Sequence, residues 1–148
     1  NPSRWHRNIF NYYPINYAPN NYHELTKHWL DKIPTLGDRI MEVGCYSALS
    51  LIWLKSNFPE KDIIGIDINL NVVHYARTRA YFFQKDIPIY CGDGCDLKSY
   101  GGKSKDVIFH TGLLEHLEPE ERIKMLKEQL RVAQYVLFTV PTDKGLEE

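Results

Sequence analysis

Three carboxylates recur at nearly even spacing along the chain, each at the end of an apolar run. Glu42 lies in RIMEV, Asp67 closes IIGID and Asp93 follows IPIYCG, so they stand 25 and then 26 residues apart. One strand–helix unit takes roughly 25–30 residues, so this spacing aligns the three side chains along one rim of a parallel sheet. Such a rim suits a nucleoside, because a carboxylate after the second strand accepts hydrogen bonds from ribose hydroxyls.

A glycine stands where the first apolar run would turn into a helix. Gly44 gives the tight turn that lets backbone N–H groups face a ligand, and Asp67 follows it 23 residues later. Each carboxylate also has a structural interpretation, Asp67 as a helix N-cap and Asp93, in GDG, as a turn residue that bonds its own backbone. Both interpretations stay open for each residue alone, and the common spacing favours a ligand site.

The elements that must hold these residues are predicted from hydrophobic patterning. Apolar runs without alternation predict buried strands, and they alternate mostly with amphipathic stretches that predict helices. In the last of these helices, Ile123, Leu126 and Leu130 are expected to face inward. The right-handed crossover rule then gives an α/β fold, a doubly wound and mainly parallel sheet with helices on both faces. The expected strands are 39–43, 62–68, 87–93, 106–112 and 135–141, and the expected helices are 23–33, 47–58, 70–83 and 118–133.

The two ends of the chain differ from this pattern. Residues 1–22 are dense in Tyr, Asn and Pro without periodicity, which predicts an aromatic N-terminal arm that packs on the domain or closes over a ligand. Residues 23–148 form the expected domain. The chain stops soon after the fifth strand, so the domain is expected to be incomplete at its C-terminus.

Composition excludes several classes of protein. The 148 residues suffice for one domain with its own core, and 18 basic against 19 acidic side chains argue against a nucleic-acid binder held by bulk charge. No apolar run approaches the ~20 residues that span a bilayer. Three cysteines, an odd number, indicate reduced thiols and a cytoplasmic protein.

Beyond the single motifs, the order of several segments resembles a known family. The segments MEVGCYSALSL, IIGIDI, IYCGDG, DVIFHTGLLEHL and LKEQLRVAQYVLFTVP are similar to those of the class I S-adenosylmethionine-dependent methyltransferases. The nearest likeness is to the branch with E-V-G-C-G-x-G and a strand that ends in L-E-H. It covers about residues 36–142 in the order and spacing of the family. The resemblance implies a Rossmann-like methyltransferase fold with S-adenosylmethionine as cofactor and S-adenosylhomocysteine as product.

The resemblance assigns the methionine and ribose parts of the cofactor to the first two strand ends. The loop around the methionine part would comprise Glu42, Gly44, Cys45 and Tyr46. Asp67 would hold the ribose hydroxyls.

The remaining cofactor contacts would come from the next strand ends. The backbone at Ile68 would lie beside the adenine, and Asp93 would accept from the adenine amino group with Gly94 next to it. His110 would begin the loop after the fourth strand, close to the methionine amino group and the sulfonium.

The acceptor side would follow in the same loop, where the resemblance places Glu115 and His116. Methyl transfer is an in-line displacement in which alignment does much of the work, and a base is needed only if the acceptor loses a proton. His116 is the candidate catalytic base, because imidazole titrates near neutral pH, with packing of the turn as the alternative. His74 is expected to be structural.

No metal site is predicted. Glu115, His116 and Glu118 offer oxygen and nitrogen ligands, but adjacent residues on one turn rarely converge on one ion. Cys91 and Cys95 flank the expected adenine site and are interpreted as buried small residues.

Two departures from the family pattern bear on function. Tyr46 and Ala48 replace the second and third glycines of the loop, so Tyr46 would point away from the cofactor, cover it, or fill its cavity. The helix and two strands that normally follow the fifth strand are also missing.

The main hypothesis is therefore a methyltransferase for a small-molecule acceptor, with no membrane partner. The alternative is a catalytically degenerate S-adenosylmethionine-binding or regulatory domain. A nicotinamide-dependent oxidoreductase is disfavoured, because GCYSA lacks the three glycines of the dinucleotide loop. The acceptor, its reacting atom and the oligomeric state stay open.

Overall fold

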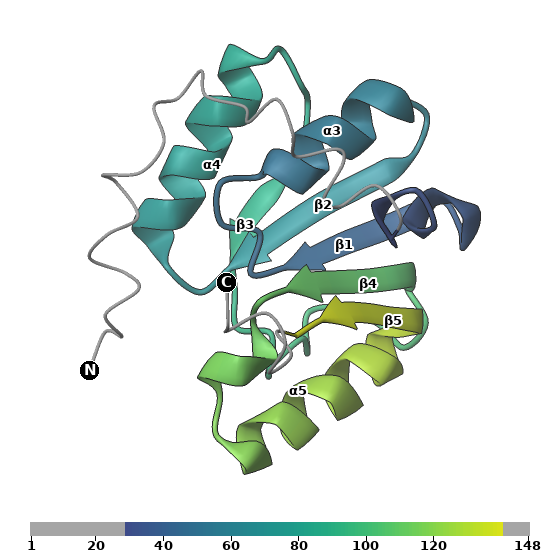
Figure 1. Cartoon of the computed structure of the whole chain (residues 1–148), viewed down its shortest axis with the longest axis vertical. Coiled ribbons are helices and arrows are strands. Elements are labelled where there is room, and N and C mark those ends of the chain that lie inside the picture. The colour runs from purple at the N-terminus through teal and green to yellow at the C-terminus, as the bar shows by residue number, and fades with distance from the viewer. Residues whose placement is uncertain (1–28, 141–148) are drawn as a thin grey trace, which may run out of the picture.

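The computed structural model describes residues 29–140, and within them a five-stranded sheet forms the centre (Figure 1). All the strand pairs are parallel and the order is β3-β2-β1-β4-β5. The doubly wound α/β fold expected from the patterning is confirmed. The strands are β1 (Arg39–Val43), β2 (Asp62–Asp67), β3 (Ile89–Cys91), β4 (Lys105–Thr111) and β5 (Ala133–Thr139).

Between these strands, the described part of the chain has three α-helices and one short 3-10 helix, and a second 3-10 helix, η2, precedes β1. The helices α3 and α4 follow β1 and β2, whereas α5 joins β4 to β5. No helix lies between β3 and β4. The bounds are α3 (Leu49–Asn57), α4 (Leu70–Phe82), α5 (Pro119–Val132), η2 (Ile33–Thr35) and η3 (Leu114–His116).

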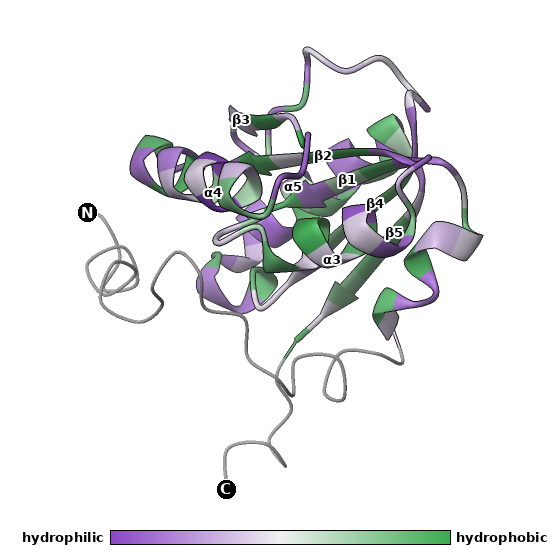
Figure 2. Ribbon diagram, turned by 90° about the horizontal axis from the view of Figure 1, so that it is seen from above, coloured by the Kyte–Doolittle hydropathy of each residue, from purple (hydrophilic) through white to green (hydrophobic). Residues whose placement is uncertain are grey.

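The helices α3 and α4 lie on one face of the sheet and α5 lies on the other (Figure 1), and the strands between them are coloured mainly as hydrophobic (Figure 2). The residues of α3 and α4 pack with Ile40, Ile63 and Phe109 on one face. Leu97 and the end of α5 pack with the alternate side chains of the same strands on the other face. The three central strands β1, β2 and β4 are buried over most of their length, which is the pattern expected where both faces of a parallel sheet are covered, whereas β3 and β5 at the two edges are largely exposed.

The inward face predicted for α5 was wrong for Ile123 and Leu130, whereas Leu126 is half-buried. Its buried residues are Met125, Gln129 and Val132, whereas Ile123 is 56% and Leu130 is 50% exposed. The prediction placed the apolar residues of the helix against the sheet. The face that contacts the sheet instead includes a glutamine, Gln129. Tertiary packing thus overrides the local apolar pattern on this helix.

The amino-terminal edge of the sheet is braced by one carboxylate. Asp106, on β4, accepts hydrogen bonds from the backbone N–H groups of Asp38 and Arg39 at 2.9 and 2.8 Å, and from the Arg39 guanidinium. The hydrogen bonds from Arg39 hold the pKa of the Asp106 carboxyl well below its usual range. The brace fixes β1 beside β4.

Several sequence predictions concern residues that the structure does not describe. The arm at 1–22 and most of the helix expected over 23–33 lie outside the described residues. None of the helices within 29–140 combines the length and hydrophobicity that a membrane crossing requires.

Candidate functional site

The site predicted at the carboxyl ends of the strands is built around the break in strand order. β1 lies at the centre of the sheet. The chain adds β2 and β3 on one side of β1 and then crosses over to add β4 and β5 on the other side. In open parallel sheets, ligands bind beyond the carboxyl ends at such a point. Glu42, Asp67 and Asp93 lie at or just after the ends of β1, β2 and β3, in agreement with their spacing.

The loop between β1 and α3 has three residues in the left-handed backbone region. Gly44 has φ 68°, Tyr46 φ 47° and Ala48 φ 57°. These are the positions that hold glycine in the family pattern, and the reason is conformational, because glycine alone adopts this region without a steric cost. The loop keeps the glycine-type geometry with tyrosine and alanine in two of the three places.

Asp67 is held by backbone donors from this loop and from the start of α4. Its Oδ2 accepts from the Tyr46 backbone N–H at 3.1 Å, and its Oδ1 accepts from the Asn69 N–H at 3.0 Å. The N-cap of α4 is Asn69, whose side chain accepts from the N–H of Asn71 and Val72. The interpretation of Asp67 as an N-cap was therefore wrong, and its carboxylate is fixed at the rim by two backbone donors.

Glu42 lies deeper than Asp67. It is 4% exposed, and its Oε2 has no hydrogen-bond partner among the described residues. Burial raises the pKa of Glu42 well above its ordinary value, the nearby charge of Asp67 raises it further, and a hydrogen bond with Ser50 works in the opposite direction. A buried carboxylate oxygen without a donor fits a cationic group, since a cation would compensate its desolvation.

Cys45 and Tyr46 contribute to the loop in different ways. The Cys45 side chain is buried against Gly65, where an added Cβ would lie 3.0 Å from Sγ, and its N–H donates to Ile66. Burial, with the charges of Glu42 and Asp67, raises the pKa of this thiol. The Tyr46 side chain is half-buried. Burial lowers the pKa of the Arg79 guanidinium in α4, and the nearby phenols of Tyr75 and Tyr46 act in the opposite direction.

Asp93 is exposed and lies at the start of a turn. The Asp93 Oδ1 accepts from the backbone N–H of Cys95 at 2.8 Å, so the turn role considered for this residue is confirmed. Gly94 is buried, and an added Cβ would lie 2.6 Å from Val43 and 3.0 Å from Met125. The Ile68 side chain is 63% exposed at the same rim.

His110 lies inside β4, not at the start of the loop that follows. Its imidazole is fully buried and stacks on Phe138, with ring centroids 5.4 Å apart. It lies beside Gln129 of α5, although neither ring nitrogen makes a well-formed hydrogen bond. Burial lowers the pKa of His110 to about 4, against a smaller opposite effect of Gln129. The side chain therefore faces α5 and the core.

The loop after β4 carries the predicted acceptor side. Gly112 has φ 58°, and η3 places His116 Nε2 4.0 Å from Glu115 Oε1. The Oε2 of Glu115 is buried without a hydrogen-bond partner in the described part of the chain. Leu113 lies over Gly44, where an added Cβ would be 3.4 Å from its side chain. This loop is therefore in contact with the β1–α3 loop.

Sequence reasoning missed two contacts of this site, Ser50 with Glu42 and Leu113 with Gly44. Neither residue type carries a signal of its own, because serine in a first helical turn and leucine in a loop are ordinary. A surface depression lined by residues 77–87 lies at the opposite, amino-terminal edge of β3 and holds none of the predicted residues. Among residues 29–140, no cluster of three His, Cys, Asp or Glu side chains is arranged to hold a metal ion.

A fold of this strand order with acidic residues at three successive strand ends defines a nucleoside-cofactor domain. Residues 40–134 match the family model described as a methyltransferase domain. The chain therefore belongs to this family, within the class I S-adenosylmethionine-dependent methyltransferases.

Curated relatives agree with this membership, and a solved structure shares the fold. The chain is 30% identical over 100 residues to the malonyl-[acyl-carrier protein] O-methyltransferase of Xylella fastidiosa, covering 65% of this chain and 33% of that protein. It is 28% identical over 134 residues to the tRNA (guanine-N(7)-)-methyltransferase of Aedes aegypti, covering 86% and 51%. The structure of the PH0226 protein from Pyrococcus horikoshii shares the fold with a TM-score of 0.75 and 22% identity, covering 87% of this chain and 60% of that one. The chain spans between about a fifth and half of the length of the curated relatives it matches.

Proposed function

We propose that this chain binds S-adenosylmethionine at the carboxyl edge of the sheet and transfers its methyl group to a small-molecule acceptor. The observation that carries the proposal is the preset carboxylate of Asp67. Two backbone N–H groups hold it at the rim, while the buried Oε2 of Glu42, which has no hydrogen-bond partner within residues 29–140, lies in the adjoining strand end. A rim carboxylate suits ribose hydroxyls and a buried unpaired carboxylate suits an ammonium group, and the cofactor carries both.

The residues take the following parts in cofactor binding. Asp67 accepts from the ribose hydroxyls, and Asp93 accepts from the adenine amino group with Ile68 and Gly94 beside it. Glu42 and the backbone of the 44–46 loop surround the methionine part. An ammonium group near Glu42 would lower the pKa of that carboxyl, which burial now raises.

The chemistry needs few groups from the protein. The bound cofactor supplies an electrophilic methyl group, whose bond to sulfur breaks with its electron pair left on sulfur as the acceptor atom bonds to carbon. His116 takes the proton when the acceptor has one to lose, since it is exposed on the loop that follows β4. Glu115, 4.0 Å away, stabilises the imidazolium that results. His110, stacked in the core, is proposed only as a neighbour of the cofactor's methionine end.

The surface beside the predicted acceptor side carries several acidic residues. The loop after β4 and the first turn of α5 carry Glu115, Glu118, Glu120 and Glu121, and the net charge of the chain is −1. Polyanions are repelled from such a surface, so a small molecule is favoured over nucleic acid as the acceptor. The tRNA substrate in the name of the Aedes aegypti relative makes RNA the comparison to include in the test.

Loss of catalysis with retention of cofactor binding is the second candidate. Tyr46 supports it, because a tyrosine in the left-handed region occupies a place where glycine lets a ligand approach. The electrostatic interaction of its phenol with Arg79 of α4 supports the active form instead.

Calorimetric titration of this chain with S-adenosylmethionine and S-adenosylhomocysteine, with NAD as control, tests the cofactor. Micromolar binding of the first two without NAD binding is expected, and binding of NAD alone would overturn the proposal. Transfer of a labelled methyl group to a set of small nucleophiles and to tRNA then tests the acceptor. Cofactor binding without transfer to any of them would favour the degenerate domain.

A further inference from the structure

The segment that carries Asp93 has no regular structure of its own. Residues 92–104 connect β3 to β4 without a helix or a strand, and the turn of Asp93 opens this connection. A segment without a hydrogen-bonded ladder depends on neighbouring elements for its position. The neighbour here is α5, which belongs to the next part of the chain.

The first contacts between α5 and this segment lie beside Asp93. Gly94 packs so closely that an added Cβ would lie 3.0 Å from Met125 of α5. The thiol of Cys95 donates to the backbone oxygen of Glu121 at 3.7 Å. The residues directly after Asp93 are thus in contact with the first half of α5.

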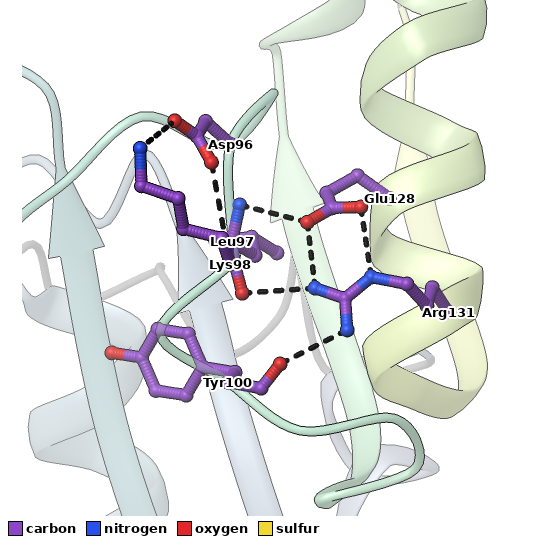
Figure 3. Close-up of polar contacts among 6 residues, drawn as sticks. All are labelled: Asp96, Leu97, Lys98, Tyr100, Glu128 and Arg131. Atoms are coloured by element: carbon purple, nitrogen blue, oxygen red, sulfur yellow. Dashed lines mark hydrogen bonds and ion pairs between the residues drawn. The ribbon is translucent and has the colours of Figure 1, made fainter.

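The strongest contacts follow at residues 97–100 (Figure 3). Glu128 Oε1 accepts from the backbone N–H of Leu97 at 3.0 Å, and Arg131 donates to the carbonyls of Leu97 and Tyr100, each at 3.0 Å. Arg131 and Glu128 also form two hydrogen bonds with each other, at 2.7 and 2.9 Å. One ion pair therefore satisfies three backbone groups of a segment that lacks a ladder.

Further contacts attach the C-terminal end of the 92–104 connection to the end of α5. The Lys103 ammonium donates to the carbonyls of Leu130 and Ala133 at 2.6 and 2.9 Å. The Leu97 side chain is 2% exposed and packs beside Val132. The connection is therefore attached to α5 along its length, while α5 begins directly after the loop of His116.

An exposed ion pair by itself stabilises a protein little. The Glu128–Arg131 pair differs, because it presents charged donors and acceptors to backbone groups, and charge-assisted hydrogen bonds of this kind are short and directional. Its main effect is therefore on where the backbone of residues 97–100 lies. The position of the Asp93 turn, which is continuous with that backbone, follows from it.

We propose that Glu128 and Arg131 are positioning residues for cofactor recognition, which hold the 92–104 connection on α5 so that Asp93 meets the adenine amino group. The inference rests on the proposed function, in which Asp93 accepts from that amino group. It adds that α5 determines the adenine contact, although no residue of α5 touches the adenine.

The test uses two ligands that differ only at the adenine amino group. One is S-adenosylhomocysteine, and the other is its analogue with hydrogen in place of the 6-amino group. Titration compares the unchanged chain with Arg131→Met, Asp93→Ala and the double variant. We expect each single change to raise the Kd for S-adenosylhomocysteine about five- to tenfold, and the double variant to lose no more than either single change. The Kd for the analogue should stay within twofold in all the variants.

Two further variants separate positioning from folding. Lys127→Met removes an exposed cation from the same helix and should leave both dissociation constants unchanged. Glu128→Gln keeps an acceptor for Leu97 and should lose less affinity than Glu128→Ala. Thermal unfolding of each variant, without ligand, verifies that it is folded.

The outcomes distinguish the two proposals. Equal loss of affinity for both ligands in Arg131→Met would assign the pair a general structural role and overturn the inference. A loss of affinity for S-adenosylhomocysteine in Asp93→Ala, without a loss in Arg131→Met, would also overturn the inference, but it would leave the proposed function intact. Absence of binding by the unchanged, folded chain would overturn both.

Discussion

At the scale of single residues, the β1–α3 loop carries the largest conformational demand. Gly44 has φ 68°, a region where a non-glycine residue costs roughly 1–2 kcal/mol, and Leu113 lies against it. Tyr46 and Ala48 already bear that cost in the same loop. A further substitution therefore adds to strain that is already present.

Gly44→Ala should lower the free energy of unfolding by about 1–2 kcal/mol, because the added Cβ strains the left-handed backbone. Urea unfolding followed by circular dichroism measures the loss. Gly101→Ala is the matched control, since an added Cβ there meets nothing within 4 Å, and it should be neutral or slightly stabilising. Equal effects of the two changes would contradict the explanation from backbone strain.

Asp67→Ala should weaken binding of S-adenosylhomocysteine at least tenfold, because the ribose hydroxyls would lose a charged acceptor worth about 1.5–3 kcal/mol. Asp86→Ala removes an exposed carboxylate at the opposite edge of the sheet and serves as the control. Calorimetry gives both dissociation constants. An unchanged affinity in Asp67→Ala would refute the ribose role.

His110 should make stability depend on pH. Its pKa is about 4 in the folded protein and 6.5 when unperturbed, so between these values the unfolded chain binds more protons. Its contribution is therefore complete above pH 6.5 and is lost as the pH falls toward 4, by at most about 3 kcal/mol. Urea unfolding from pH 7 to pH 4 should show this slope in the unchanged chain and a smaller one in His110→Phe. The same slope in both would contradict the assignment.

At the scale of elements, the position of α5 could be predicted from the sequence, whereas its buried face and its contacts with residues 97–100 could not. The helix was expected over 118–133, and its proline start and acidic first turn follow capping and charge rules that act locally. The face that it buries depends on the sheet, which a local pattern does not describe. The hydrogen bonds of Glu128 and Arg131 to the backbone of residues 97–100 were equally invisible, because any residue type supplies such carbonyls.

Met125→Ala should destabilise the protein by about 2–5 kcal/mol, since a buried side chain between α5, Val43 and Gly94 is removed. Ile123→Ala should change stability by less than about 0.5 kcal/mol, because Ile123 is more than half exposed. Chemical unfolding of the two variants compares the faces directly. A larger loss of stability in Ile123→Ala than in Met125→Ala would instead support the face predicted from the apolar stripe.

At the scale of the whole molecule, the parallel sheet and its carboxyl edge were predictable because both depend on regular repetition. All five strands were located, and β1 matches its expected bounds of 39–43. The spacing of Glu42, Asp67 and Asp93 placed them at successive strand ends, as found. The burial of His110 was not predicted. A shift of one residue in the expected end of β4 is enough to move this side chain from the loop into the core.

The strand order also has a consequence for how the chain folds during synthesis. β1 pairs with β2 soon after both have been made, but its other neighbour, β4, lies much later, since Ile40 pairs with Val107. Contacts between distant residues form slowly, because closing a long loop costs entropy before the contact is gained. Until β4 leaves the ribosome, the central strand of the finished sheet is an exposed edge, open to pairing with another chain. We therefore expect nascent chains that end between β3 and β4 to aggregate more readily than chains that already include β4.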